Sequence, residues 1–308
     1  MKLILLSLLV FSVFLSFSNA TDSFSVGIWN DDTSINIGFV DFNGNETSKQ
    51  LVIPGFYYPS NTNQTSTYNF NTNILTFIAE TVKYKKPFLI IVDCTSWQVV
   101  TNVSLVFGYG YVGLASDQSN RNIVYGFYYK SFYENILYGI IIQENGKISY
   151  AYQKVFGSYK SSVFNTKTEN YLIAFQNSTG SFMRSYSFNF NFINEAPLTF
   201  SNNKFEILNE PFPMASVNGT TLGTIPMKWI GDKPVFGLAY LDSTQCHFNF
   251  TKMIAYGTDT ITTSTQRDSF IFIFAKSVGG QFYLYTFSTL SSSFLSYKLY
   301  YTPILSVF

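Results

Sequence analysis

The chain has 308 residues, of which 19% are aromatic and only 12% charged, and its 19 Lys and Arg nearly balance its 18 Asp and Glu. Disordered chains have few aromatic residues and a high net charge, so this composition predicts an ordered protein. The near-zero net charge and the lack of a basic stripe remove the usual driving force for nucleic-acid binding, and no nucleic-acid partner is expected.

The first 20 residues have the order of a secretory signal peptide. Lys2 precedes an apolar run from Leu3 to Phe17, and small residues surround the expected cleavage point after Ala20. The run is shorter than the roughly 20 residues that a spanning helix needs. We therefore expect a secreted, extracellular protein whose mature chain, residues 21–308, forms a single domain with no membrane span.

Strands are predicted throughout the mature chain, because apolar and polar residues alternate with a period of two. These segments are rich in Phe, Tyr, Ile and Val, and Asn, Gly, Ser and Pro separate them at short intervals. The clearest examples are residues 34–42, 73–80, 122–129, 185–193 and 269–275. No helical period follows residue 20, so the predicted fold class is all-β.

The strands recur at a nearly constant spacing. A polar turn followed by a strand repeats every 48 to 51 residues, at Ile74, Ile123, Tyr171, Leu222 and Phe270. We place the first member of the series at Ile35, which lies 39 residues before Ile74. About six units of roughly 48 residues therefore fill the chain, which is the signature of a repeat architecture.

Most units also contain a hairpin whose turn opens with an acidic residue or a serine. Such a side chain accepts hydrogen bonds from the backbone two residues on, which suits a tight turn. These hairpins lie at residues 38–53, 88–100, 139–152, 237–250 and 283–297. Two hairpins per unit are typical of one propeller blade, so we predict a β-propeller of about six blades of four antiparallel strands. Two β-sandwich domains are the alternative.

The order of a polar turn and strand before a strand–Asp–turn–strand hairpin resembles YVTN-type and related propeller repeats. The resemblance is one of pattern and covers most of the mature chain. No WD dipeptide or kelch double glycine recurs along it.

Cys94 and Cys246 are the only cysteines, and two cysteines in an exported chain would ordinarily form one disulfide. However, Asp93 and Asp242 mark equivalent turns in the second and fifth units, on opposite sides of a six-bladed ring. Six sheets spaced about 10 Å apart give a mid-blade diameter of roughly 20 Å. Bonded cysteines need Cα atoms within about 7 Å of each other. We therefore predict that the two thiols are unbonded.

The residues favour a non-catalytic protein and leave the question of enzymatic activity open. His247 is the only histidine, and its neighbour Cys246 would point to the opposite face of a strand, so no metal or other cofactor is expected. Serine-nucleophile motifs are missing, and the glycine clusters lie between strands. Asp117, Glu134 and Asp268 are candidate carboxylates for a propeller-fold, glycan-active hydrolase.

Tyrosines at strand ends and in loops are the candidate binding residues: Tyr57, Tyr58, Tyr109, Tyr111, Tyr128 and Tyr129. Tyrosine offers an apolar face and a polar tip, which suits stacking on a sugar or contact with a protein. The expected function is therefore a secreted, non-catalytic binding or adhesion protein with a glycan or protein partner. An extracellular coat or matrix component is an alternative, and the competing interpretation of the tyrosines is that most belong to the core.

Six sequons for N-glycosylation accompany the signal peptide, at Asn45, Asn63, Asn102, Asn177, Asn218 and Asn249. About five would arise by chance in a chain so rich in Asn, Ser and Thr under the N-x-[ST] rule. They are consistent with a secreted glycoprotein because the signal peptide already indicates secretion.

Overall fold

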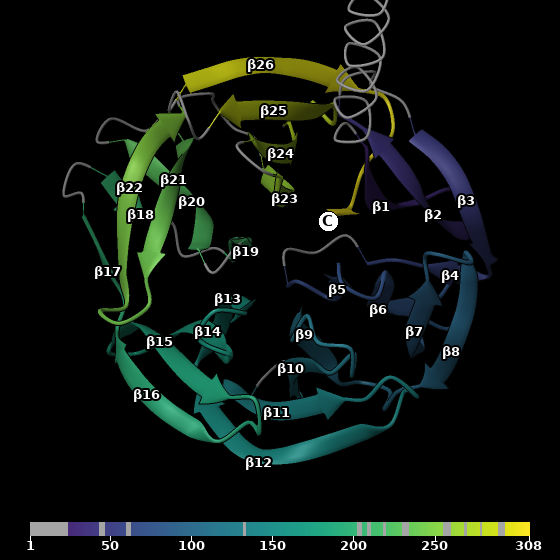
Figure 1. The fold of residues 1–308 in the computed structure, drawn as a ribbon, viewed down its shortest axis with the longest axis horizontal. Coiled ribbons are helices and arrows are strands. Elements are labelled where there is room, and N and C mark those ends of the chain that lie inside the picture. The colour runs from purple at the N-terminus through teal and green to yellow at the C-terminus, as the bar shows by residue number, and fades with distance from the viewer. Residues whose placement is uncertain are drawn as a thin grey trace, which may run out of the picture.

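The computed structural model describes residues 24–42, 47–59, 63–131, 134–201, 205–207, 211–217, 220–229, 234–254, 260–267, 270–277, 279–288 and 293–308. Six sheets surround a central axis in a ring (Figure 1), and all strand pairs are antiparallel except one short pair. The prediction of a six-bladed β-propeller is confirmed, and the two-sandwich alternative is wrong. No helix in the described ranges is long and apolar enough to cross a membrane.

Each sheet is one blade, and its strands run from the axis to the rim. Blade 1 consists of β27 (Ser306–Val307), β1 (Phe24–Asn30), β2 (Ser34–Asp41) and β3 (Thr47–Pro54). Blade 2 consists of β5 (Ser66–Asn69), β6 (Ile74–Thr81), β7 (Pro87–Asp93) and β8 (Gln98–Ser104), and β4 (Phe56–Tyr57) also pairs with β6. Blade 3 consists of β9 (Gly110–Ser116), β10 (Val124–Tyr129), β11 (Ile136–Ile142) and β12 (Ile148–Phe156).

The second half of the ring follows the same plan. Blade 4 consists of β13 (Ser158–Asn165), β14 (Asn170–Asn177), β15 (Gly180–Ser187) and β16 (Phe192–Pro197). Blade 5 consists of β19 (Met214–Val217), β20 (Thr220–Trp229), β21 (Pro234–Asp242) and β22 (His247–Ile254). Two short strands extend it, β18 (Phe205–Ile207) beside β20 and β17 (Thr199–Phe200) parallel to β22. Blade 6 consists of β23 (Thr260–Arg267), β24 (Phe270–Lys276), β25 (Phe282–Ser288) and β26 (Ser293–Tyr300).

Blade 1 closes the ring by combining the two ends of the described chain. β27 is its innermost strand and pairs with β1, with Val307 opposite Gly27 and Ser306 opposite Ile28. The backbone N–H of Leu305 donates to the carbonyl of Ile28 at 3.0 Å, immediately beside this pair. The last strand of the described chain therefore holds the first one, and the ring has no open seam.

The propeller core is divided among the blade interfaces. The described residues form six buried apolar clusters, and each cluster joins two neighbouring blades. Strands of a sheet that packs on both faces have nearly continuous apolar sequences, which explains segments such as residues 88–92 and 139–142. Stability therefore comes mainly from packing between blades.

Turns alternate between the two faces of the ring. One face, which we call the inner-turn face, carries residues 70–73, 117–123 and 166–169, which join the innermost strand of a blade to the next. The opposite face carries residues 105–109, which connect blades 2 and 3, and residues 130–131 and 134–135, which lie between β10 and β11. We call it the connection face. A side chain at the end of a strand therefore lies on either the inner-turn face or the connection face.

Two details of the predicted repeat are wrong. Ile35 lies on β2, the third strand of its blade, whereas Ile74, Tyr171, Leu222 and Phe270 lie on second strands. Second and third strands both follow a polar turn and both show alternation, so these two features do not tell one kind of strand from the other. The strand predicted at residues 185–193 is the end of β15, a turn at residues 188–191 and the start of β16.

The two cysteines lie in the outer-hairpin turns of blades 2 and 5, and both are buried, free thiols. Burial and the charge of Asp93 raise the pKa of Cys94 to about 12. Burial, together with Asp242, also raises the pKa of Cys246. Because only the thiolate is reactive, both groups stay protonated and inert near neutral pH.

Alkylation with iodoacetamide, measured by intact mass without reductant, tests this placement. We expect two alkyl groups to be added in denaturant and none to the folded protein over the same time. A chain that gains none even in denaturant contains a disulfide, and the opposed placement of the two turns would then be wrong.

The predicted signal peptide and the sequons at Asn45 and Asn218 lie outside the described residues.

Candidate functional site

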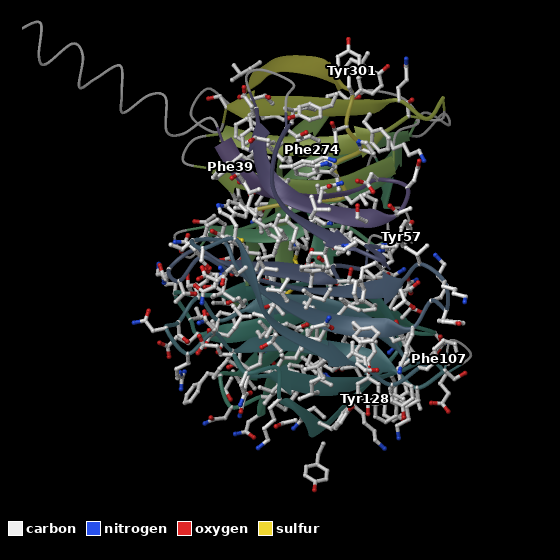
Figure 2. The ribbon with its side chains drawn as sticks, turned by 90° about the vertical axis from the view of Figure 1, so that its right-hand side faces the viewer. Phe39, Tyr57, Phe107, Tyr128, Phe274 and Tyr301 are labelled. Carbon is white, nitrogen blue, oxygen red and sulfur yellow. The ribbon has the colours of Figure 1, made fainter. Side chains whose placement is uncertain are left out.

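Five tyrosines meet on the connection face of blade 3. Tyr109 lies just before β9, and the others lie one on each strand of the blade, at Tyr111, Tyr128, Tyr138 and Tyr150. The register explains the convergence, because Tyr128 of β10 pairs with Tyr111 on one side and with Tyr138 on the other. We call these five residues the tyrosine cluster. Tyr128 and the nearby Phe107 mark its position in Figure 2.

The rings of the tyrosine cluster pack around Tyr128. Its ring centroid lies 5.0 Å from that of Tyr109 and 5.4 Å from that of Tyr138, both in stacked arrangements. Tyr150 approaches edge-on at 5.4 Å. These separations fall in the range in which aromatic pairs attract one another beyond their burial. The cluster is therefore a rigid block of rings.

The cluster has a buried base and an exposed rim. Tyr111 and Tyr128 are buried, while 51% of Tyr150 and 68% of Phe107 remain accessible to solvent. The hydroxyl of Tyr111 accepts a hydrogen bond from the backbone N–H of Val106 at 3.2 Å, which ties the 105–109 segment to the base. The exposed rings are thus held on a fixed support.

Two lysines flank the cluster. The Nζ atoms of Lys130 and Lys154 lie 4.6 Å and 5.3 Å from the centroid of the Tyr138 ring. Each ammonium group is within cation–π distance of the ring, which orders the long side chains beside the tyrosines. The rim therefore presents apolar rings, phenol hydroxyls and positive charge together.

The phenol hydroxyls of Tyr111, Tyr128 and Tyr150 remain protonated at physiological pH. Burial raises the pKa of Tyr111, Tyr128 and Tyr150, and the neighbouring phenol groups raise it further. A protonated phenol both donates and accepts hydrogen bonds. These three tyrosines consequently offer hydrogen bonds without a negative charge.

The structure brings together only half of the predicted binding tyrosines. Tyr109, Tyr111 and Tyr128 belong to the cluster, but Tyr58 is buried inside the ring, where its hydroxyl lies 2.7 Å from Oγ of Ser66. The hydroxyl of Tyr129 accepts a hydrogen bond from the backbone N–H of Tyr159 at 2.7 Å. The ring of Tyr57 makes a cation–π contact with Lys85. These three tyrosines lie outside the cluster.

Tyr138, Tyr150 and Phe107 were not among the predicted binding residues. A signal for Tyr150 was available, because Tyr150 and Tyr152 alternate on a strand in which water-facing positions would ordinarily be polar. Tyr138 carries no such signal, since only the pairing of β10 with β11 places it beside Tyr128. Phe107 lies in an irregular segment, where no period applies.

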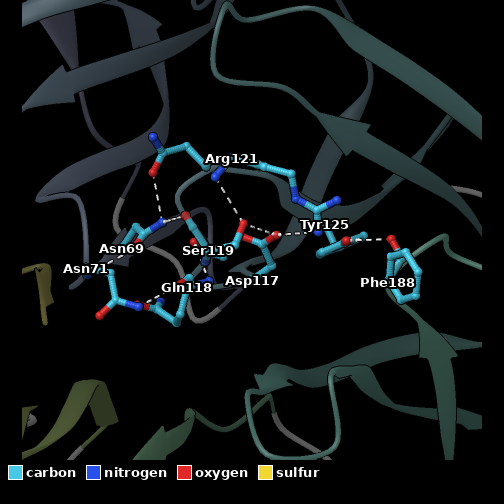
Figure 3. Close-up of polar contacts among 10 residues, drawn as sticks. Asn69, Asn71, Asp117, Gln118, Ser119, Arg121, Tyr125 and Phe188 are labelled. Carbon is cyan, nitrogen blue, oxygen red and sulfur yellow. Dashed lines mark hydrogen bonds and ion pairs between the residues drawn. The ribbon is translucent and has the colours of Figure 1, made fainter.

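A second polar cluster joins blades 2 and 3 on the inner-turn face (Figure 3). Nδ2 of Asn69 donates to the carbonyl of Ser119 at 2.7 Å and to Oδ1 of Asn122 at 2.8 Å. The backbone N–H of Phe70 donates to Oε1 of Gln118 at 2.8 Å. Because these groups bind one another, the cluster is a clasp between two turns.

Among the candidate carboxylates that the structure describes, Asp117 and Glu134 do not form a catalytic pair. Asp117 belongs to this clasp, where its Oδ1 accepts the backbone N–H of Ser119 at 3.0 Å and its Oδ2 lies 3.9 Å from Arg121. Glu134 lies on the connection face, beyond the whole length of β10, or roughly 20 Å away at about 3.3 Å per residue. Asp268 lies outside the described residues.

His247 has a structural contact. Its Nδ1 lies 2.7 Å from Oγ1 of Thr199, which joins the short strand β17 to the outer edge of blade 5. Within the described ranges, no group of three or more His, Cys, Asp or Glu side chains could hold a metal ion.

The described sequons differ in exposure. Asn102 and Asn249 are exposed on the outermost strands β8 and β22. Asn177 is half-buried, and its Oδ1 accepts the backbone N–H of Thr179 within a turn. Asn63 is also half-buried, and its carbonyl accepts the N–H of Gly113 at 2.8 Å. Asn102 and Asn249 are thus the more accessible acceptors.

No protein-family model matches the sequence, and no curated protein matches it. A chain of the nidogen–laminin complex is similar in structure, with a TM-score of 0.59 and 8% identity, over 92% of this chain and 97% of that one. A protein of unknown function from Bacteroides caccae has a TM-score of 0.54 and 10% identity over 92% and 97%. An oligogalacturonate lyase in complex with manganese has a TM-score of 0.54 and 8% identity over 85% and 70%. At these identities, the likeness shows the propeller fold alone.

Proposed function

We propose that the protein is a secreted, non-catalytic binding or adhesion protein whose tyrosine cluster contacts a glycan or protein partner outside the cell. The observation that carries this proposal is the buried pair of Tyr111 and Tyr128, against which the exposed Tyr150 packs. The segment tied to Tyr111 through Val106 also carries the exposed Phe107. A binding surface gains affinity when its aromatic anchors are already ordered before the partner arrives.

The chemistry of the rim suits such a contact. An exposed ring stacks on the C–H face of a sugar or on an apolar side chain, and the phenol hydroxyls supply hydrogen bonds at its edge. Aromatic residues with adjacent cations are also enriched at the centres of protein interfaces. A propeller chain in the nidogen–laminin complex is a structural precedent for a ring of this size taking part in a protein assembly.

A second candidate function is a component of an extracellular coat or matrix. The observation that favours it is the apolar surface of two neighbouring rim strands, where Tyr152 and Phe156 of β12 and Phe192 and Ile193 of β16 are all exposed. Strands at a sheet edge with exposed apolar residues can pair with another chain. A concentration-dependent increase in mass on size exclusion would support self-association, and a monomer at all concentrations would contradict it.

The binding proposal is tested with the mature chain, residues 21–308, on a glycan array and on a panel of purified extracellular-matrix proteins. The cluster variant Phe107→Ser/Tyr150→Ser removes both exposed rings. Tyr84→Ser/Tyr301→Ser is the matched control, because those two tyrosines are exposed but lie outside the cluster.

We expect one ligand class to bind the wild type and the control equally and the cluster variant at least tenfold more weakly. All four positions are exposed, so each substitution should change the free energy of unfolding by less than about 0.5 kcal/mol. Absence of any ligand, or binding that survives loss of both rings, would overturn the proposal.

A further inference from the structure

A cavity of about 140 Å³ lies on the axis of the ring, between the innermost strands. Every blade contributes at least one residue to its wall: Ser306, Ser66, Ser116, Val163, Ser216 and Thr265. None of its lining residues belongs to the tyrosine cluster, which lies on the connection face of blade 3. The cavity is therefore a separate candidate site.

The side chains that line this cavity are uncharged. The described residues that line it include no Asp, Glu, Lys, Arg or His. Hydroxyl groups of Ser and Thr share the wall with small apolar side chains such as Ala115 and with aromatic rings such as those of Tyr68 and Phe164. An anion entering it would lose hydration without meeting a positively charged side chain, which is strongly unfavourable. The side chains of the wall therefore favour a neutral occupant over an anion.

Hydroxyl groups of blades 1 and 2 bond to one another at the cavity, whereas one hydroxyl of blade 5 has no partner among the described residues. Oγ of Ser66 lies 2.8 Å from Oγ of Ser306 and 2.7 Å from the hydroxyl of Tyr58, so blades 1 and 2 pair their own hydroxyls. In blade 5, Oγ of Ser216 is buried and has no hydrogen-bond partner among the described residues. A buried hydroxyl without a partner is costly, and a ligand or water that bonds to it removes that cost.

The volume limits the size of the occupant. An apolar cavity of about 150 Å³ holds one benzene molecule, which has six non-hydrogen atoms. The cavity in this ring is of similar size but has mixed walls, so a molecule with both C–H and O–H groups fits it better than a hydrocarbon. We propose that the axial cavity binds a small neutral polyol of three to five carbons. This inference does not depend on the proposed function of the tyrosine cluster.

Saturation-transfer NMR on the folded, mature protein tests the proposal, with glycerol, erythritol and xylitol as probes. Erythronate is the charged comparison and benzene the apolar one. The variant Ser216→Ala/Thr265→Val removes two hydroxyls without adding bulk, and Thr101→Val on the outer strand β8 is the matched control. Ala215→Leu fills the cavity, and its melting curve shows whether the ring still folds.

We expect at least one polyol to bind wild type and Thr101→Val equally, and neither comparison molecule to bind. Loss of each hydroxyl should weaken binding about fivefold, and Ala215→Leu should abolish it while the protein stays folded. If no polyol shows a saturation-transfer signal, water alone fills the cavity and the proposal is overturned. Equal binding of erythronate, or binding unchanged in the double variant, would overturn it as well.

Discussion

Replacing Phe190 with alanine is expected to lower the free energy of unfolding by about 3–5 kcal/mol, the usual cost of removing a buried phenylalanine ring. Phe190 is 2% exposed and lies in the turn between β15 and β16. Its ring stacks on Tyr186 with a centroid separation of 4.8 Å and on Tyr125 at 5.8 Å. It therefore joins blades 3 and 4 at the largest concentration of buried rings in their interface.

The opposite wall cannot fill the space that the ring would leave. A Cβ atom built on Gly139 would lie 2.2 Å from Cε1 of Phe190, so that glycine is what admits the ring. Phe190 also has a φ of 60°, and alanine at this position keeps the same unfavourable backbone conformation. The substitution therefore leaves a cavity without relieving strain.

Phe188→Ala is the matched control for this prediction, because it alters the same turn but removes a ring that is 43% exposed. Urea unfolding followed by circular dichroism should give a much lower midpoint for Phe190→Ala and a nearly unchanged midpoint for Phe188→Ala. Equal midpoints for the two variants would contradict the packing of blades 3 and 4.

Substitution of Val307 by aspartate is the second large effect we expect, with a loss of at least about 3 kcal/mol, because it buries an unpaired carboxylate. Val307 is 3% exposed and packs with Phe42 and Phe274 where blade 6 meets blade 1. Since β27 is the innermost strand of blade 1, its displacement would open the ring at the seam between the first and last strands.

Val52→Asp on β3 is the control, because Val52 belongs to the same blade but is 49% exposed on its outermost strand. Limited proteolysis and urea unfolding should both distinguish the two variants, with rapid cleavage of Val307→Asp near blade 1. A Val307→Asp protein as stable as wild type would show that β27 does not close the ring.

Much of this fold follows from local rules in the sequence. Oδ1 of Asp93 accepts the backbone N–H of Thr95 at 2.7 Å, and Oδ1 of Asp242 accepts that of Thr244 at 3.0 Å. These are the turns that the Asp residues predict, and each joins the two outer strands of a blade. Hairpins set by turn chemistry and a constant spacing were therefore sufficient to predict the propeller.

The remaining features depend on contacts that no local pattern encodes. The turn between β15 and β16 contains the buried Phe190. This apolar residue continues the alternation of β15, so the sequence of the turn resembles that of a strand. The closing strand β27 has two residues, too few to show a period. Tyr138 enters the candidate site only through the register of β10 and β11, which is set by the whole sheet.

Hydroxyl-radical footprinting of the protein with its bound partner tests the central claim most directly, because it reports on each exposed aromatic ring. We expect the partner to protect Phe107 and Tyr150 from oxidation. Tyr84 and Tyr301, which are exposed elsewhere, should react as in the free protein. Protection of Tyr84 or Tyr301 with full reactivity at Phe107 and Tyr150 would place the binding surface outside the tyrosine cluster and contradict the account.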